Sequence, residues 1–256
     1  MPELILASTS PYRRQLLERL RLPFTVLAPG VSETHEPGEL PADRAARLAL
    51  AKAQALAERH PEALVIGSDQ VAALGAQILD KPGDATRCRA QLAAASGERV
   101  RFHTGCALLG AGGTVRLVHL DTTTVVFRTL EAAEIARYVE AERPFDCAGG
   151  FRAEALGIAL FERIESADPT ALIGLPLIWL ATALRRAGCA VPCPLYPSRS
   201  STAPSSGGSG ALALKVAPSG HSKLMLCAWR NMRFSPMACS SALQPASPYL
   251  LSPATG

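Results

Sequence analysis

The sequence predicts an α/β fold in which a mixed β-sheet is flanked by helices. From Met1 to about Gly188, short apolar runs typical of strands alternate with amphipathic stretches of helical periodicity. Two long strand-like segments flank the turn signal Gly110–Thr114 and are predicted to pair as a hairpin, which makes at least this part of the sheet antiparallel. We therefore expect a single folded domain over residues 1–188.

Each predicted element follows from a local pattern. Leu4–Leu6 is an apolar run short enough for a buried strand, and the leucines after Pro11 recur at helical spacing behind Ser10, a natural N-cap. Thr122–Phe127 consists of strong strand formers. The predicted strands are Leu4–Leu6, Phe24–Leu27, Leu64–Ile66, Val100–Leu109, Val115–Arg128 and Ile158–Glu162. The predicted helices are Pro11–Leu20, Pro41–Arg59, Ala85–Ala95, Leu130–Glu142 and Leu175–Ala187.

The composition of the chain changes after Gly188. Of the 68 residues from Cys189 to Gly256, 27 are Ser, Pro or Gly and none is acidic. Such a segment buries too little apolar surface to offset its conformational entropy. We expect residues 189–256 to be a disordered tail, and we hypothesise that this tail is an appended or out-of-frame extension with no part in catalysis.

Composition also excludes several classes of protein. Residues 1–188 carry 21 basic and 22 acidic side chains, a balance that does not favour nucleic-acid binding by a basic surface. No signal peptide is evident, and the longest uncharged stretch outside the tail, Pro169–Leu184, is too short to span a bilayer and is interpreted as a core helix. The seven cysteines show no CxxC pair or metal spacing, which favours reduced thiols. We expect a cytoplasmic protein that binds neither nucleic acid nor membrane; its oligomeric state, a homodimer included, remains open.

The segment Ala7–Arg14, ASTSPYRR, predicts an anion site. Ser8 and the two hydroxyls that follow it, together with the free N–H groups of the helix start, can hold phosphate oxygens. The flat guanidinium groups of Arg13 and Arg14 match such oxygens in pairs. The alternative is an ordinary capped helix with a solvated basic face.

A second cluster, Leu64–Val71, runs from an apolar strand directly into Ser68, Asp69 and Gln70. Polar groups at the end of a buried strand are where an open α/β sheet usually keeps its active site. Asp69 is therefore the best candidate for a general base, a metal ligand or both. The alternative is a strand-ending aspartate that bonds to its own backbone.

Three further residues complete a predicted phosphate-handling site. Glu33 offers a second carboxylate that could share a divalent cation with Asp69. Lys52, on the helix predicted from Pro41, and Lys81, in the turn LDKPGD, could neutralise the charge of a polyphosphate. For each lysine, the alternative is an ordinary solvated position.

Five segments, in this order and spacing, resemble the Maf family of nucleotide pyrophosphatases. They are LILASTSPYRRQLL, GSDQV, the DKP turn, AGGFRAEALGI and DPTALIGLPL, and the resemblance spans Met1 to about Gly188. It implies a long mixed sheet around a deep cleft. It also implies that a nucleoside triphosphate is hydrolysed to the monophosphate and pyrophosphate with a divalent metal, Mg²⁺ or Mn²⁺.

The resemblance assigns a role to each of the conserved-motif positions. It implies phosphate contacts for Ser8, Arg13 and Arg14, metal and base roles for Glu33 and Asp69, and charge stabilisation for Lys52 and Lys81. One position departs from the family pattern, because this chain has Ser32 where many members carry an acidic residue just before the glutamate. If that acid helps to hold the metal, metal affinity is weaker here.

Three residues bear on which nucleotide is used. Tyr12, Gln70 and Glu154 resemble the branch of the family that acts on 7-methyl-GTP, whereas the branch that acts on dTTP and UTP is expected to carry Thr and Gln at the last two positions. A physical argument agrees: methylation at N7 makes guanine cationic, so its pocket gains from the aromatic face of Tyr12 and the carboxylate of Glu154. The alternative is that Tyr12 covers the helix start and Glu154 lies in solvent.

We therefore expect a 7-methyl-GTP pyrophosphatase in which Asp69 orients and deprotonates the water that attacks the α-phosphorus. A dTTP/UTP pyrophosphatase of the same family is the first alternative. The others are a non-enzymatic, nucleotide-binding regulator of cell division, and a module whose basic tail binds acidic partners or membranes.

Overall fold

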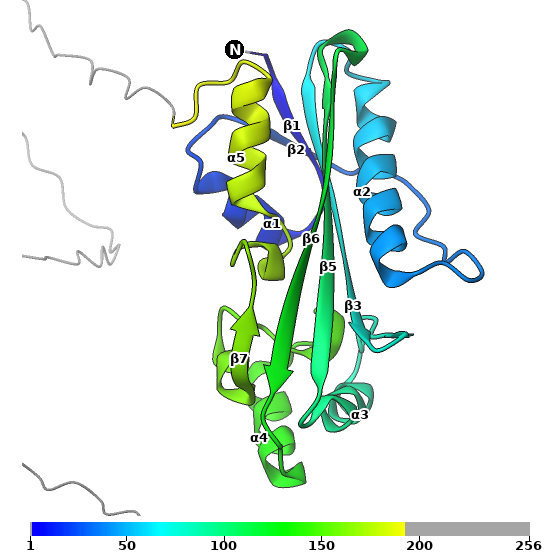
Figure 1. Ribbon diagram of the computed structural model, residues 1–256, viewed down its shortest axis with the longest axis vertical. Coiled ribbons are helices and arrows are strands. Elements are labelled where there is room, and N and C mark those ends of the chain that lie inside the picture. The colour runs from blue at the N-terminus through cyan, green and yellow to red at the C-terminus, as the bar shows by residue number, and fades with distance from the viewer. Residues whose placement is uncertain (1, 193–256) are drawn as a thin grey trace, which may run out of the picture. The chain divides into compact units, whose positions relative to one another are not determined.

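A mixed β-sheet of seven strands forms the centre of the fold in the computed structural model, which describes residues 2–192 (Figure 1). The strands lie in the order β2–β1–β3–β5–β6–β7, and β4 pairs with β3 off this path. β1 is parallel to β2 and β3, whereas the other pairs are antiparallel, so the predicted α/β fold with a mixed sheet is confirmed. The strand bounds are β1 Leu4–Ala7, β2 Thr25–Leu27, β3 Leu64–Leu74, β4 Gln77–Ile78, β5 Arg99–Gly110, β6 Val115–Phe127 and β7 Phe161–Glu165.

Helices cover both faces of the sheet. α2 packs against β3 and β5, while α1 and α5 lie on the opposite face, and α3 and α4 lie near the far end of the long strands (Figure 1). All the predicted helices are present, with ends within two residues of the predicted bounds. The bounds are α1 Pro11–Glu18, α2 Pro41–Ala57, α3 Ala85–Ala95, α4 Ala132–Glu142 and α5 Leu177–Arg186, with short 3₁₀ turns at Ala111–Gly113, Ala148–Gly150, Leu156–Leu160 and Ala171–Ile173.

Successive side chains of β3 alternate between the two faces of the sheet. Leu64 and Ile66 belong to the apolar cluster formed with α1 and α5, whereas Val65 packs in the cluster formed with α2. By the same alternation, Asp69 faces α2 and Gln70 faces the opposite side.

Two glycines let α2 lie directly on the sheet. A Cβ atom on Gly67 of β3 would lie 2.2 Å from the carbonyl oxygen of Ala49, and one on Gly105 of β5 would lie 2.3 Å from that of Ala45. These distances are far below van der Waals contact, so any larger residue would push the helix away from the strands. Lys52 lies about one turn after Ala49 in α2, so this close packing also fixes the distance of Lys52 from β3.

One edge of β3 is only partly paired. β5 pairs with β3 along its whole length, so β1 and β4 share the other edge. β1 pairs as far as Gly67 and β4 begins opposite Ala73, which leaves positions 68–72 without a strand partner on that edge within the described chain. This interruption, which we call the edge gap, places the middle of a central strand beside a cavity that Asp69, Gln70, Val71 and Ala72 line.

The strand that carries Asp69 is longer than predicted. The sequence places Asp69 beyond a strand that ends at Ile66, but β3 continues to Leu74, and Asp69 lies near its middle. The prediction was wrong because Gly67 serves the close packing of α2 rather than a turn. Asp69 is buried, but it lines the cavity beside the edge gap.

Two other segments differ from their predicted structure. β7 begins at Phe161 instead of Ile158, because Leu156–Leu160 forms a 3₁₀ turn. Residues 169–176, predicted as part of a core helix, form turns, since Gly174 has a positive φ of 119° and Pro176 is the N-cap of α5.

The packed chain continues past the predicted boundary at Gly188. Cys189 and Val191 are buried in the cluster with α1 and α5, and the Cys189 N–H donates to the carbonyl oxygen of Leu184 at 2.9 Å. The prediction of a disordered tail, from residue 193 onward, lies outside the described residues.

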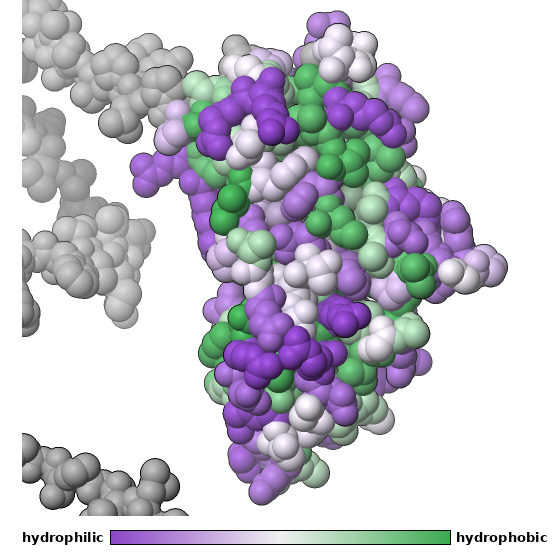
Figure 2. All heavy atoms as spheres, in the orientation of Figure 1, coloured by the Kyte–Doolittle hydropathy of each residue, from purple (hydrophilic) through white to green (hydrophobic). Residues whose placement is uncertain are grey.

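Hydrophilic and hydrophobic residues are interspersed over the face of the molecule that Figure 2 shows. None of the helices within residues 2–192 combines the length and the apolar character needed to cross a bilayer.

Candidate active site

A cavity of about 500 Å³ lies beside the edge gap. It is bounded by the residues that follow β1, by the open part of β3 and by the residues that follow β4. Its volume suits a nucleotide-sized ligand. All the predicted functional residues except Arg14 line it, namely Ser8, Tyr12, Arg13, Glu33, Lys52, Asp69, Gln70, Lys81 and Glu154. The fold thus collects in one cleft residues that are far apart in the sequence.

Lys52 forms the centre of a buried charge cluster. From α2, its Nζ donates to Oδ1 of Asp69 at 2.7 Å and lies 2.6 Å from Oε1 of Glu33. Lys52 is 5% exposed and Asp69 is 7% exposed. Buried charges are tolerated when they are paired in this way, because the pairing offsets their lost hydration. The two predicted carboxylates therefore approach the same cation.

The charge on Glu33 is set by its cationic neighbours. Partial burial acts to raise the pKa of its carboxyl, but the hydrogen bond from Lys52 and the positive charges of Lys52, Lys81 and Arg13 outweigh this effect. The pKa of Glu33 therefore lies below its ordinary value, and the side chain is an anion at neutral pH.

Arg13 supplies a buried cation at the start of α1. Its Nε donates to the carbonyl oxygen of Gly174 at 3.0 Å, and its NH1 donates to Oγ of Ser8 at 3.4 Å. Desolvation lowers the pKa of Arg13, against the opposing attraction of Asp69. Ser10 is the N-cap, as predicted, since its side chain accepts a hydrogen bond from the Arg13 N–H. Ser8 and Arg13 therefore lie together at a helix start, the arrangement that binds anions.

Arg14 lies apart from this cavity. Its Nε donates to Oε1 of Glu18 at 3.1 Å, its side chain is 63% exposed, and it lines a separate hollow with Leu22 and Phe24. Successive helical residues point about 100° apart, so Arg13 and Arg14 do not face the same ligand. The expected phosphate contact of Arg14 is corrected accordingly.

The segment Asp168–Leu177, DPTALIGLPL, forms one wall of the cavity through Leu172 and Ile173. Nε2 of Gln70 donates to the carbonyl oxygen of Ala171 at 2.9 Å and to Oγ1 of Thr104 at 3.1 Å. Oγ of Ser68 donates to the carbonyl oxygen of Gly174 at 2.8 Å. Because the amide nitrogen of Gln70 is bonded to the scaffold, its carbonyl oxygen is the polar group left to face a ligand.

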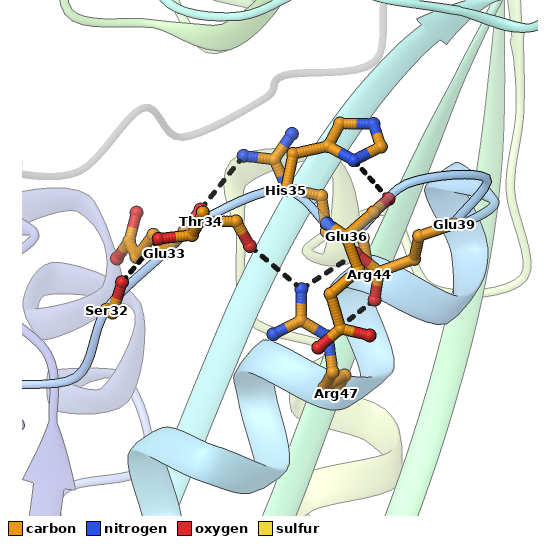
Figure 3. Close-up of polar contacts among 8 residues, drawn as sticks. All are labelled: Ser32, Glu33, Thr34, His35, Glu36, Glu39, Arg44 and Arg47. Atoms are coloured by element: carbon orange, nitrogen blue, oxygen red, sulfur yellow. Dashed lines mark hydrogen bonds and ion pairs between the residues drawn. The ribbon is translucent and has the colours of Figure 1, made fainter.

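The loop between β2 and α2 presents Glu33 (Figure 3). The carbonyl oxygen of Glu33 accepts from NH2 of Arg44 at 3.3 Å, and that of Thr34 accepts from NH2 of Arg47 at 3.1 Å. Ser32, at the position that departs from the family pattern, shares a 2.6 Å hydrogen bond with the hydroxyl of Thr34 and does not line the cavity. Two arginines of α2 thus bind the main chain at and directly after Glu33.

Aromatic and acidic side chains form another part of the cavity wall. The Tyr12 hydroxyl donates to Oδ2 of Asp146 at 3.3 Å. The Arg152 guanidinium binds Oδ1 of Asp146 at 3.1 Å and lies 5.9 Å from the centre of the Tyr12 ring. Tyr12, Asp146 and Glu154 line the cavity, but Arg152 does not. Desolvation raises the pKa of Tyr12, so its hydroxyl stays neutral.

Three charged residues of the cavity, Arg44, Asp80 and Asp146, were not predicted from the sequence. The Arg44 side chain is 14% exposed and its NH1 lies 3.8 Å from Oδ1 of Asp80. Arg44, Leu48 and Lys52 follow one another at intervals of four on α2 and all line the cavity, so helical spacing from Lys52 is the signal that would have found Arg44. No comparable pattern marks Asp146.

The donor set fits a divalent cation. Glu33 and Asp69 supply carboxylate oxygens, the ligands that Mg²⁺ and Mn²⁺ prefer, and both carboxylates approach the Lys52 ammonium. Within residues 2–192, no group of three or more His, Cys, Asp and Glu side chains makes a metal site by itself. The remaining ligands would come from substrate phosphates, which is the usual way proteins bind Mg²⁺.

Comparison with known proteins agrees with the resemblance in the sequence. Residues 3–187 match the family described as Maf-like protein. A relative from Pseudomonas syringae pv. tomato, named 7-methyl-GTP pyrophosphatase, is 54% identical over 192 residues, which cover 75% of this chain and the full length (100%) of that relative. Relatives of the same name from Xanthomonas axonopodis pv. citri and Pseudomonas aeruginosa are 55% and 52% identical, each over 75% of this chain and 100% of the relative. The chain therefore belongs to the Maf family.

Proposed function

We propose that this protein is a nucleoside triphosphate pyrophosphatase that hydrolyses 7-methyl-GTP to 7-methyl-GMP and pyrophosphate. The name shared by the relatives that are 52% to 55% identical supports this reaction. We place the reaction in the cytoplasm, where it would remove a modified nucleotide from the pool.

The distribution of charge in the cavity is the observation that carries the proposal. Its basic side chains, Arg13, Arg44, Lys52 and Lys81, come from α1, α2 and the segment after β4, and they line the cavity together with the carboxylates of Glu33, Asp69 and Asp80. The segment 146–154 contributes the carboxylates of Asp146 and Glu154 to the lining and no basic side chain. A ligand with a polyphosphate at one end and a cationic base at the other matches this distribution.

In the proposed reaction, Asp69 accepts a proton from the water that attacks the α-phosphorus. The hydrogen bond from Lys52 to Oδ1 orients the carboxylate and leaves Oδ2 to take the proton. A bond forms between the water oxygen and the α-phosphorus, the bond from that phosphorus to the bridging oxygen breaks, and pyrophosphate leaves with the electron pair.

Cations near the leaving group lower the barrier. Arg13, Lys52 and Lys81 stabilise the charge that builds on pyrophosphate, which is where catalysis of such transfers mostly lies. A Mg²⁺ or Mn²⁺ ion held by Glu33 and Asp69 would polarise the phosphates when bound.

Base selection is assigned to Tyr12, Glu154 and Gln70. The ring of Tyr12 offers a face to the methylated base, in a contact worth on the order of 0.5–2 kcal/mol. Hydrogen bonds from N1–H and the exocyclic amine of the base to Glu154 add roughly 1.5–3 kcal/mol. The carbonyl oxygen of Gln70 is available to a further donor of the base.

Pyrophosphate release from 7-methyl-GTP, GTP, UTP, dTTP and CTP tests the proposal. We expect the highest kcat/KM with 7-methyl-GTP, with activity dependent on Mg²⁺ or Mn²⁺. A preference for dTTP and UTP would assign the chain to the other branch of the family. Nucleotide binding without turnover would instead favour a regulator.

A further inference from the structure

The loop that carries Glu33 has no structure of its own to position that residue. Residues 28–40 contain no helix or strand, and the Glu33 side chain is 59% exposed, so packing does not hold it either. The loop is held against α2, because two arginines of that helix donate to two successive main-chain carbonyls, those of Glu33 and Thr34. Arg44 binds the carbonyl of Glu33, and Arg47 binds the carbonyl of Thr34 (Figure 3).

Arg47 is the stronger of these two attachments. Its Nε and NH2 donate to the two oxygens of Glu39 at 2.5 Å and 2.7 Å, and Nε lies 3.3 Å from Oε1 of Glu36. The Glu39 side chain is 7% exposed and the Arg47 side chain 32% exposed, so this bidentate pair is only partly shielded from water. One guanidinium therefore joins the middle of the loop, at Thr34, to its end, at Glu39.

Arg47 acts at a distance from the cavity. It does not line the cavity, whereas Leu48 and Lys52, on the neighbouring face of the same helix, do. Glu33 reaches Lys52 only if the loop lies along α2, where Arg44 and Arg47 both donate to its main chain. Loss of a partner that positions a metal-binding carboxylate typically lowers metal affinity or activity by about 10- to 100-fold.

We propose that Arg47 and Glu39 are positioning residues for the reaction, which lock the β2–α2 loop so that the Glu33 carboxylate is held beside Lys52 and Asp69. This role rests on the proposed function, because it presumes that Glu33 contributes to turnover. Arg44 supports the same loop from the cavity side.

A double-mutant cycle tests whether Arg47 acts through Glu33. Arg47→Met is expected to lower kcat by about 10- to 100-fold, the usual effect of removing an outer partner of a ligand. The KM for the nucleotide is expected to change less than about threefold, because Arg13 and Lys81 are untouched. In the Glu33→Gln background, the same substitution is expected to lower kcat less than about twofold.

Two further variants separate positioning from folding. Glu39→Gln leaves the helix intact and removes the charge that holds Arg47, so it should lower kcat in the same sense. Arg47→Lys keeps the charge but not the fork, so it should recover only part of the wild-type rate. Arg128→Met is the matched control, because Arg128 also joins a carboxylate, that of Glu134, to a main-chain carbonyl, but away from the cavity.

Mn²⁺ binding, measured by electron paramagnetic resonance with a non-hydrolysable nucleotide analogue, gives a readout independent of turnover. We expect Arg47→Met and Glu33→Gln to raise the dissociation constant of Mn²⁺ about 10-fold or more, and Arg128→Met to leave it unchanged. Wild-type turnover is measured first, since its absence is a failure of the proposed function. Given wild-type turnover, an equal loss of kcat from Arg47→Met with and without Glu33 would overturn the positioning role.

Discussion

Nζ of Lys52 donates a 2.7 Å hydrogen bond to Oδ1 of Asp69, between two side chains that are both almost fully buried. This bond fixes the orientation of the proposed general base without help from solvent. The proposed mechanism therefore gives Lys52 a second role beside charge stabilisation, because its hydrogen bond to Oδ1 leaves Oδ2 of Asp69 as the free carboxylate oxygen.

Asp69→Asn is expected to lower kcat at least about 100-fold, since general-base catalysis contributes roughly 10² to 10⁴ in rate. The amide keeps the shape of the side chain and its carbonyl oxygen still accepts from Lys52, so the fold should survive. Pyrophosphate release under saturating nucleotide measures the effect, with circular dichroism as the check on folding. Wild-type kcat in the variant would assign the proton transfer to another group.

The pKa of Glu33 is expected to rise when its cationic neighbours are removed. Because its pKa in the folded protein is below the ordinary value, Glu33 adds stability above about pH 4.3, and this contribution is lost as the pH falls through the folded pKa. Lys81→Met should raise the pKa, and Lys52→Met should raise it further by also removing the hydrogen bond. Carboxyl ¹³C shifts followed from pH 7 to pH 2.5 without added metal give the values. An unchanged Glu33 titration in Lys81→Met would contradict the charge arrangement described.

Gly67→Ala is expected to destabilise the fold by about 1–3 kcal/mol or more, because the added methyl group overlaps the carbonyl oxygen of Ala49. Relief requires α2 to move off the sheet and to take Lys52 with it, so activity should fall together with stability. Urea unfolding and pyrophosphate release measured on the same preparation test this link. A stable variant with full activity would show that α2 tolerates a larger separation from β3.

Glu154→Gln is expected to reduce the preference for 7-methyl-GTP over GTP by about 10- to 100-fold, the effect of losing roughly 1.5–3 kcal/mol of charged hydrogen bonding. The ratio of kcat/KM for the two nucleotides is the measurement, since a loss of folded protein cancels in it. Glu140→Gln, on the exposed side of α4, is the control. An unaltered ratio would remove Glu154 from base selection.

Truncation after Pro192 is expected to leave activity and Tm unchanged, in line with the hypothesis that the tail plays no part in catalysis. Truncation after Gly188 should lower Tm, because it deletes Cys189 and Val191 from the apolar cluster with α1 and α5. Thermal unfolding of the two shortened proteins beside the full chain makes the comparison. Loss of activity in the protein that ends at Pro192 would give the tail a function.

Much of the site could be predicted because its residues stand in short local patterns. Ser8 and Arg13 follow a strand and enclose a helix start, and the N-cap at Ser10 depends only on neighbours in sequence. Asp69 was found by its chemistry, although its strand was given the wrong end. The cause is tertiary: Gly67 is required by the approach of Ala49, a contact with a residue 18 positions away.

The site residues that were predicted wrongly or missed depend on which way a side chain points in the fold, and not on residue type. Arg13 and Arg14 are identical in chemistry, and only the rotation of α1 decides that one faces the cavity and the other pairs with Glu18. Asp146 lines the cavity, where it accepts a hydrogen bond from the hydroxyl of Tyr12, a residue 134 positions earlier in the chain. Patterns within a short window carry no information on such contacts.

The edge gap also bears on self-association. An unpaired strand edge is a template on which a strand of another molecule can add, and proteins protect such edges. Here the stretch without a strand partner spans positions 68–72, which are mostly buried beside the cavity, and β1 and β4 lie at its two ends. Because β1 ends opposite Gly67 and β4 begins opposite Ala73, a strand added at the edge gap could pair with at most five residues of β3. Such a short pairing offers little stabilisation to an intermolecular sheet.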